Sequence, residues 1–162
     1  MSDVCIIGLG SPHGDDQLGW ELVRLLENEG VQSSVETPLR ITACATLGGE
    51  VLECWKGADL AIIVDAVRGA LPPGTVRHII LHPQHDLSEV DAVRTLTSHS
   101  IDLRALMDLA MALDEIPTRV VLIGVEVEAC APFESMSAPA CAALPGLVRA
   151  VRAEISAFSG ND

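Results

Sequence analysis

The sequence predicts an α/β fold: a three-layer α/β/α sandwich around a mostly parallel, twisted sheet of about five strands. The first observation is that three short runs are continuously apolar and rich in β-branched residues, without polar alternation. Such runs are typical of strands buried on both faces, as in a parallel sheet covered by helices. They span residues 4–7, 60–64 and 120–123. The second observation is that segments with helical spacing separate these runs, and strand–helix alternation indicates this fold class.

The first helix is predicted directly after the first strand. Its apolar stripe is formed by leucines at positions 18, 22, 25 and 26. Gly30 follows this stripe, and glycine commonly ends a helix. Two weaker strands are predicted over residues 34–43 and 75–81.

Two further helices complete the predicted fold. One has its apolar stripe over residues 103–110, with Ser98 or Ser100 as its N-cap. The last covers residues 144–155, after Ser137. Pro145 falls inside that pattern, and because proline lacks the backbone N–H, we expect a kink or a broken start there.

The length and charge limit the domain count and the possible partners. The chain has 162 residues, which fit one domain over residues 1–162, and it contains no repeat or linker that would divide it. Its formal charge is −13, and Lys56 is the only lysine. Nucleic acid and anionic membrane surfaces would be repelled, because binding them requires clustered basic residues. We also expect no signal peptide, and every apolar stretch falls short of the ~20 residues of a membrane helix.

The cysteines indicate the cellular compartment. They stand at positions 5, 44, 54, 130 and 141, an odd number without a Cys-x-x-Cys spacing. We therefore expect free thiols in a reducing cytoplasm rather than a disulfide framework or a zinc finger. Cys44 could form a nucleophilic pair with a histidine, but no neighbour in sequence would lower its pKa, so a core cysteine is the favoured interpretation.

Acidic residues follow two of the buried strands. Asp15 and Asp16 come in the glycine-containing turn after the first strand, and Asp65 comes directly after the run 60–64. In open α/β sheets the ligand site lies beyond the carboxyl ends of the strands. Carboxylates that converge there are costly unless a cation joins them. The sequence therefore predicts a metal site, although one of the two adjacent aspartates could serve only to stabilise a helix N-terminus.

Histidines are the other candidate metal ligands in this sequence. His99 precedes the helical stripe 103–110, where a helix N-terminus favours the neutral imidazole that a metal ion needs. His82 and His85 form a weaker pair away from the acidic strand ends. A dinucleotide-binding loop is disfavoured because the third glycine of the Gly-x-Gly-x-x-Gly pattern would fall at His13.

The segment 8–19, Gly-Leu-Gly-Ser-Pro-His-Gly-Asp-Asp-Gln-Leu-Gly, resembles the opening signature of the hydrogenase maturation endopeptidases. The resemblance continues in order through residues 62–66, 97–100, 121–126 and 136–145, nearly the whole chain. It implies an endopeptidase, a hydrolase that removes a C-terminal peptide from the large-subunit precursor of a nickel–iron hydrogenase. Nickel would already be installed in that precursor and would serve to recognise it.

The family's metal-contacting triad falls on Asp16, Asp65 and His99 in this sequence. The resemblance thus implies that these residues contact nickel, with Asp16 and Asp65 as the catalytic candidates. The cation could polarise the scissile carbonyl or activate a water, or one of the two carboxylates could act as general base. We expect a small cytoplasmic protein that acts as a monomer.

Two alternatives remain open at this stage. Residues 43–46 read Ala-Cys-Ala-Thr where the family has Asp-Gly-Gly-Thr, so the chain could bind a maturation partner without cutting it. A phosphoacceptor receiver domain also has an acidic pair after its first strand and an aspartate after its third. It requires a lysine at the end of its fifth strand, however, where this chain has Glu126.

Overall fold

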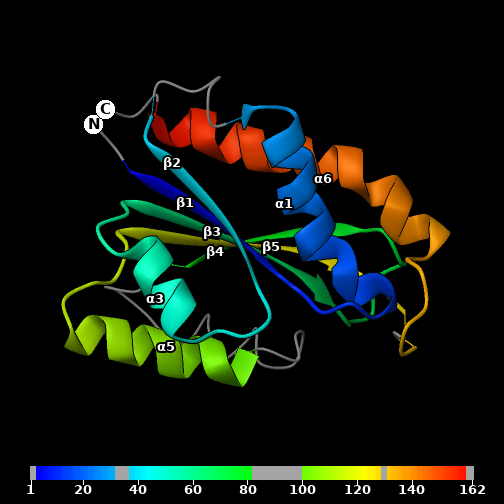
Figure 1. The fold of residues 1–162 in the computed structure, drawn as a ribbon, viewed down its shortest axis with the longest axis horizontal. Helices are drawn as coiled ribbons and strands as arrows, with labels where there is room; N and C mark the ends of the chain where they lie inside the picture. The colour runs from blue at the N-terminus through cyan, green and yellow to red at the C-terminus, as the bar shows by residue number, and fades with distance from the viewer. Residues whose placement is uncertain (1–2, 32–36, 82–99, 129–130, 160–162) are drawn as a thin grey trace.

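The computed structural model describes residues 3–31, 37–81, 100–128 and 131–159. At its centre lies a five-stranded sheet with the order β2-β1-β3-β5-β4 (Figure 1). The strands are β1 (Val4–Leu9), β2 (Leu39–Cys44), β3 (Leu60–Val67), β4 (Val76–Leu81) and β5 (Arg119–Glu126). Four of them are mutually parallel, and β4 joins the edge antiparallel to β5. The prediction of a mostly parallel sheet of about five strands is confirmed.

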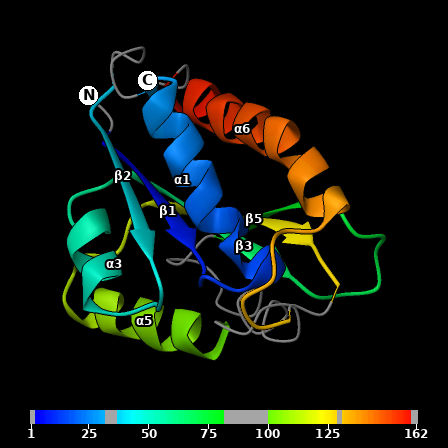
Figure 2. The same ribbon diagram turned by 45° about the vertical axis from the view of Figure 1, so that its right-hand side comes forward.

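Helices cover both faces of the sheet, as Figures 1 and 2 show. The helices α1 (Leu18–Asn28) and α6 (Ala138–Ser159) lie on one face, and α3 (Gly49–Trp55) and α5 (Ser100–Ala112) lie on the other. Successive strand residues point to opposite faces. Ile62 accordingly packs in the core beneath α1 and α6, and its neighbour Ile63 packs in the core beneath α3 and α5. These are the three layers that the uninterrupted apolar strands predicted.

Two helix ends lie close to where the sequence predicted them. Gly30 follows the last turn of α1 with φ of 64°, and its N–H donates to the carbonyl of Glu27 at 3.0 Å. This is the left-handed conformation that glycine adopts readily after a helix. The helix α5 begins at Ser100, whereas Ser98, the other candidate for its cap, lies outside the described residues.

The predicted broken start at Pro145 is wrong. The helix α6 begins at Ala138 and runs without interruption through Pro145. The start is set by Ser137, whose hydroxyl accepts the N–H of Ala140 at 3.4 Å. Leu144 and Leu147, on either side of the proline, are both buried in the core, and this packing offsets the hydrogen bond that Pro145 cannot make.

Two other elements differ from the expectation. The short helix α3 was not predicted, and β2 starts only at Leu39, while residues 34–36 of the expected strand lie outside the described part of the chain. In the described segments, every helix is too short or too polar to cross a membrane.

Candidate functional site

The strand order predicts a crevice between β1 and β3, at the carboxyl ends of the two strands. From β1 the chain passes to its neighbour β2 on one side, whereas from β3 it continues to β4 and β5 on the other side. Loops that depart in opposite directions from adjacent parallel strands leave an opening at their carboxyl ends. The residues that follow β1 and those at the end of β3 border this opening.

The turn after β1 is fixed by a direct backbone contact between β1 and α1. A Cβ atom on Gly8 would lie 2.1 Å from the carbonyl oxygen of Gly19, and one on Gly19 would lie 2.0 Å from that of Leu9. Only glycine fits at either position, so α1 starts in contact with the end of the strand. The N–H of Gly10 also donates to the carbonyl of Cys44 at 3.1 Å, which ties the turn to β2.

Asp15 and Asp16, adjacent in sequence, have different environments. Asp15 is buried, and its carboxylate accepts hydrogen bonds from the backbone N–H of Ser137 at 2.6 Å and from the Ser137 hydroxyl at 2.8 Å. Asp15 therefore supports the start of α6. Asp16 is only partly buried in the same turn. One of the two aspartates thus supports the start of a helix, but that helix is α6 and not α1, the helix that directly follows the turn.

Asp65 lies inside β3 and not after it, so the expected strand end at residue 64 is wrong. The strand continues to Val67 because β5 extends alongside it, with Asp65 in register with Gly124 and Val67 with Glu126. The side chain of Asp65 is 1% exposed. By strand alternation it points to the same face as Ile63, the face that α3 and α5 cover.

Glu126, at the end of β5, is another buried carboxylate, and the sequence interpretation did not anticipate its burial. It is 1% exposed and accepts a hydrogen bond from Arg77 Nε at 2.5 Å and another from the N–H of Gly69 at 2.7 Å. Its position after a long apolar run was the available signal. Its partners could not be identified from sequence, because they belong to β4 and to the loop after β3.

A second loop is hydrogen-bonded to the turn that carries Asp16. The carbonyl of Glu134 accepts the N–H of Gly14 at 2.9 Å and the side-chain amide of Gln17 at 3.1 Å. The N–H of Phe133 donates to Nδ1 of His13 at 3.1 Å. A cavity of about 310 Å³ opens between these two segments, and Asp15 forms part of its wall. His13, for which the sequence suggested no role, thus has a structural one.

His99 lies outside the described residues, as do His82 and His85. Of the expected triad, the structure describes two members: Asp16 lies in the short 3-10 helix that follows β1, and Asp65 lies in β3, the strand next to β1. Among the residues that it does describe, no three histidine, cysteine or acidic side chains are grouped so as to hold a metal ion.

Cys44 is a core residue, as the sequence suggested. Its side chain is 1% exposed, and burial raises the pKa of the thiol to about 11. A thiol with this pKa is almost entirely protonated at neutral pH, which disfavours it as a nucleophile.

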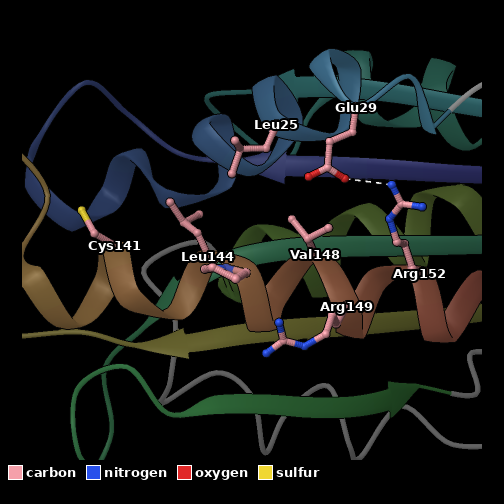
Figure 3. Close-up of a pocket in the computed structure, with 8 residues that line it drawn as sticks. Leu25, Glu29, Cys141, Leu144, Val148, Arg149 and Arg152 are labelled. Carbon is pink, nitrogen blue, oxygen red and sulfur yellow. Dashed lines mark hydrogen bonds and ion pairs between the residues drawn. The ribbon is translucent and has the colours of Figure 1, made fainter.

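A larger cavity, of about 570 Å³, lies between α1 and α6 (Figure 3). Leu25, Leu144 and Val148 give it an apolar floor, and at one end Arg152 binds Glu29 at 2.8 Å. Neither Asp16 nor Asp65 lines it. The chemistry expected at the carboxyl edge of the sheet therefore belongs elsewhere.

The chain is similar in sequence to a curated protein. The chain is 24% identical over 125 residues to the hydrogenase expression/formation protein HupD of Thiocapsa roseopersicina, a match that covers 76% of this chain. The chain spans about half the length of that curated relative, with 54% of it covered.

Solved structures share the fold. The hydrogenase maturating endopeptidase HybD from E. coli superposes with a TM-score of 0.80 at 22% identity, covering 96% of this chain and 93% of that one. A hydrogenase 2 maturation peptidase from Thaumarchaeota archaeon SCGC_AB-539-E09 gives a TM-score of 0.67 at 26% identity, covering 95% and 98%. The family model described as hydrogenase maturation protease matches residues 23–154, most of the chain. The chain therefore belongs to the hydrogenase maturation protease family.

Proposed function

We propose that this protein is an endopeptidase that removes a C-terminal peptide from the nickel-loaded large-subunit precursor of a nickel–iron hydrogenase. The observation that supports the proposal is that Asp16 follows β1 and that Asp65 lies near the end of β3, the two paired strands between which the crevice is expected. In a chain of the hydrogenase maturation protease family, this crevice is where we expect the substrate to bind.

Asp16, Asp65 and His99 are the residues we propose to contact the nickel ion of the substrate. His99 precedes Ser100, the first residue of α5, and α5 covers the face of the sheet to which Asp65 points. Two carboxylates and an imidazole provide oxygen and nitrogen donors, which suit a borderline divalent ion such as nickel. The ion belongs to the substrate, so these residues would distinguish a nickel-loaded precursor from one without nickel.

The reaction would be hydrolysis of one peptide bond. A water molecule adds to the scissile carbonyl carbon, the carbon–nitrogen bond breaks, and the departing amine takes up a proton. Asp16 or Asp65 would act as the general base that accepts the proton of the water, or both would orient the nickel ion so that it activates the water or the carbonyl.

The test is incubation with a nickel-loaded precursor, with the loss of the C-terminal peptide followed by intact-mass spectrometry. We expect the wild type to trim the precursor, and we expect Asp16→Asn, Asp65→Asn and His99→Ala each to slow trimming by about 100-fold or more. Asp108→Asn is the matched control, because Asp108 is an exposed acid that pairs with Arg104 on α5. Trimming at the wild-type rate by Asp16→Asn would refute the proposed role. A nickel-free precursor should be left intact.

A non-catalytic partner-binding role is the second candidate. The segment 43–46 lies beside the site turn, since the carbonyl of Cys44 binds both Gly10 and the indole N–H of Trp20. Ala43, Ala45 and Thr46 are exposed there and carry no carboxylate. A stable complex with a nickel-loaded precursor that is never trimmed would favour this candidate. The receiver-domain alternative has less support, because Glu126 bound to Arg77 stands where the phosphoryl-binding lysine would be needed.

We also infer that the protein acts in the cytoplasm and as a monomer. Cys5, Cys44, Cys54 and Cys141 are free thiols in the structure, which fits a reducing compartment. The proposed partner is the hydrogenase precursor alone, and the formal charge of −13 argues against nucleic acid and anionic membranes.

A further inference from the structure

Phe133 is the most exposed large apolar side chain in the described part of the molecule. Its exposed fraction is 84%, whereas the next, Leu113, is 53% exposed. Single exposed apolar residues are common on protein surfaces. Phe133 is distinguished by its place, because its loop is hydrogen-bonded to the turn that carries Asp16.

The backbone of Phe133 is held in one conformation. It has φ of 59°, in the left-handed region that residues other than glycine seldom adopt. Its N–H binds His13 Nδ1 at 3.1 Å, and its ring meets the His13 ring edge-on, with 4.6 Å between the centroids. The next residue, Glu134, is fixed through its carbonyl by Gly14 and Gln17. These contacts keep the ring in solvent without burying it.

The cavity next to the Phe133 loop is lined by several acidic residues. Among the described residues in the wall of this cavity of about 310 Å³, Asp15, Glu128 and Glu134 carry carboxyl groups, and none is a lysine or an arginine. Asp15 is buried and binds Ser137, and both Glu128 and Glu134 are exposed at the surface. A partner complementary to this surface carries positive charge beside an apolar contact.

We propose that Phe133, Glu128 and Glu134 form a docking surface for a basic segment of the hydrogenase precursor, next to the turn that carries Asp16. The proposal rests on the proposed function, since that function provides the partner. Aromatic residues at the centre of a contact commonly dominate its binding energy. Because the Phe133 backbone is already fixed, binding loses little conformational freedom. The two glutamates add attraction to a basic partner, which the formal charge of −13 reinforces at long range.

The test measures binding and cleavage separately. Affinity for the nickel-loaded precursor is compared between docking-surface variants in one common Asp65→Asn background, which should not cut. The values of kcat and KM are measured in enzymes that keep Asp65. We expect Phe133→Ala to raise Kd about tenfold or more in the Asp65→Asn background. In the active enzyme it should raise KM by a similar factor and leave kcat little changed. Phe133→Tyr should retain affinity, because it keeps the ring. Leu113→Ala is the matched control and should change neither quantity.

The charge contribution has its own measurement. Glu128→Gln combined with Glu134→Gln should raise Kd and make it less dependent on salt concentration, because two screened attractions are lost. Circular dichroism and a thermal melt establish that each variant folds, which the exposure of all three side chains favours.

The outcomes separate this proposal from the proposed function. A wild type that binds the precursor but never trims it would refute the endopeptidase proposal, and the affinity loss in Phe133→Ala would still support the docking surface. Unchanged Kd and KM in Phe133→Ala, with active wild type, would overturn the docking surface alone. Absence of precursor binding by the wild type would also overturn it.

Discussion

Arg77, on the antiparallel edge strand β4, donates from Nε to Glu126 at the end of β5, with 2.5 Å between the two atoms. The same carboxylate accepts the N–H of Gly69, in the loop after β3. Glu126 therefore joins three segments of the chain at the carboxyl edge of the sheet. Its burial means that water cannot replace a lost partner.

We expect Glu126→Ala to lower the free energy of unfolding by about 3 kcal/mol, because it leaves the Arg77 charge and the Gly69 N–H without their acceptor. Urea unfolding followed by circular dichroism measures this. The matched control is Arg104→Ala, which breaks an exposed pair with Asp108 and should cost about 0.5 kcal/mol or less. Equal losses in the two variants would show that burial of the Glu126 pair has no energetic weight.

We expect substitution of Asp15 to lower the stability of the fold and substitution of Asp16 to abolish activity. Asp15→Ala removes both hydrogen bonds to Ser137 and should cost about 2–3 kcal/mol of stability. Asp16→Ala should change stability by about 0.5 kcal/mol while abolishing trimming. Thermal melts and the precursor assay, run on both variants, check the pair. If Asp16→Ala destabilised more than Asp15→Ala, the division of roles would be reversed.

Gly19 should be intolerant of any side chain. A Cβ atom there would overlap the carbonyl oxygen of Leu9, and relief requires β1 and α1 to separate. We expect Gly19→Ala to cost about 3 kcal/mol or more, at the severe end of overpacking effects. Gly49→Ala, at the start of α3, is the control, because a Cβ atom there meets nothing within 4 Å. It should be neutral or stabilising by about 0.5 kcal/mol.

Cys44 should be chemically inert in the folded protein. Because its pKa is raised to about 11, about one thiol in a thousand is ionised at pH 8. Iodoacetamide at pH 8 should therefore leave Cys44 unmodified until the protein is denatured, while the exposed Cys141 is labelled. Peptide mass spectrometry reads both sites. Cys44→Ala should still trim the precursor, and loss of trimming would indicate a cysteine nucleophile instead.

The same raised pKa sets a dependence of stability on pH. The unfolded thiol loses its proton near its ordinary pKa of 9.0, whereas the folded thiol keeps it up to about 11. The stabilising contribution is therefore complete below pH 9 and disappears as the pH rises from 9 to 11. Cys44→Ala should remove this contribution to the alkaline loss of stability, measured by urea unfolding across that range.

The central strands were predictable because they are buried on both faces, which makes their sequence uniformly apolar. The end of β3 was not, since the residues after Val64 include an aspartate, and only the pairing with β5 extends the strand to Val67. The helix α3 gave a weak signal because it has seven residues and begins at a glycine, and its burial of Val51 and Trp55 reflects tertiary packing.

The acidic residues of the candidate site could be predicted from sequence because they lie at or after the ends of apolar strands. The roles of Asp15, His13 and Glu126 were not, because each depends on a partner far along the chain. Local patterns contain no information about such pairs. The same limit explains why the sequence assigned both adjacent aspartates to one turn but could not decide which of them supports a helix.

The hydrogen bonds between Asp15 and Ser137 join residues that are 122 positions apart. During synthesis, the turn with Asp16 leaves the ribosome long before the residue that completes its support. The N-terminal strands can pair first, but the crevice takes its final shape only when the start of α6 has emerged. A nascent chain would thus have no finished site with which to cut, so activity is delayed until nearly the whole domain has been made.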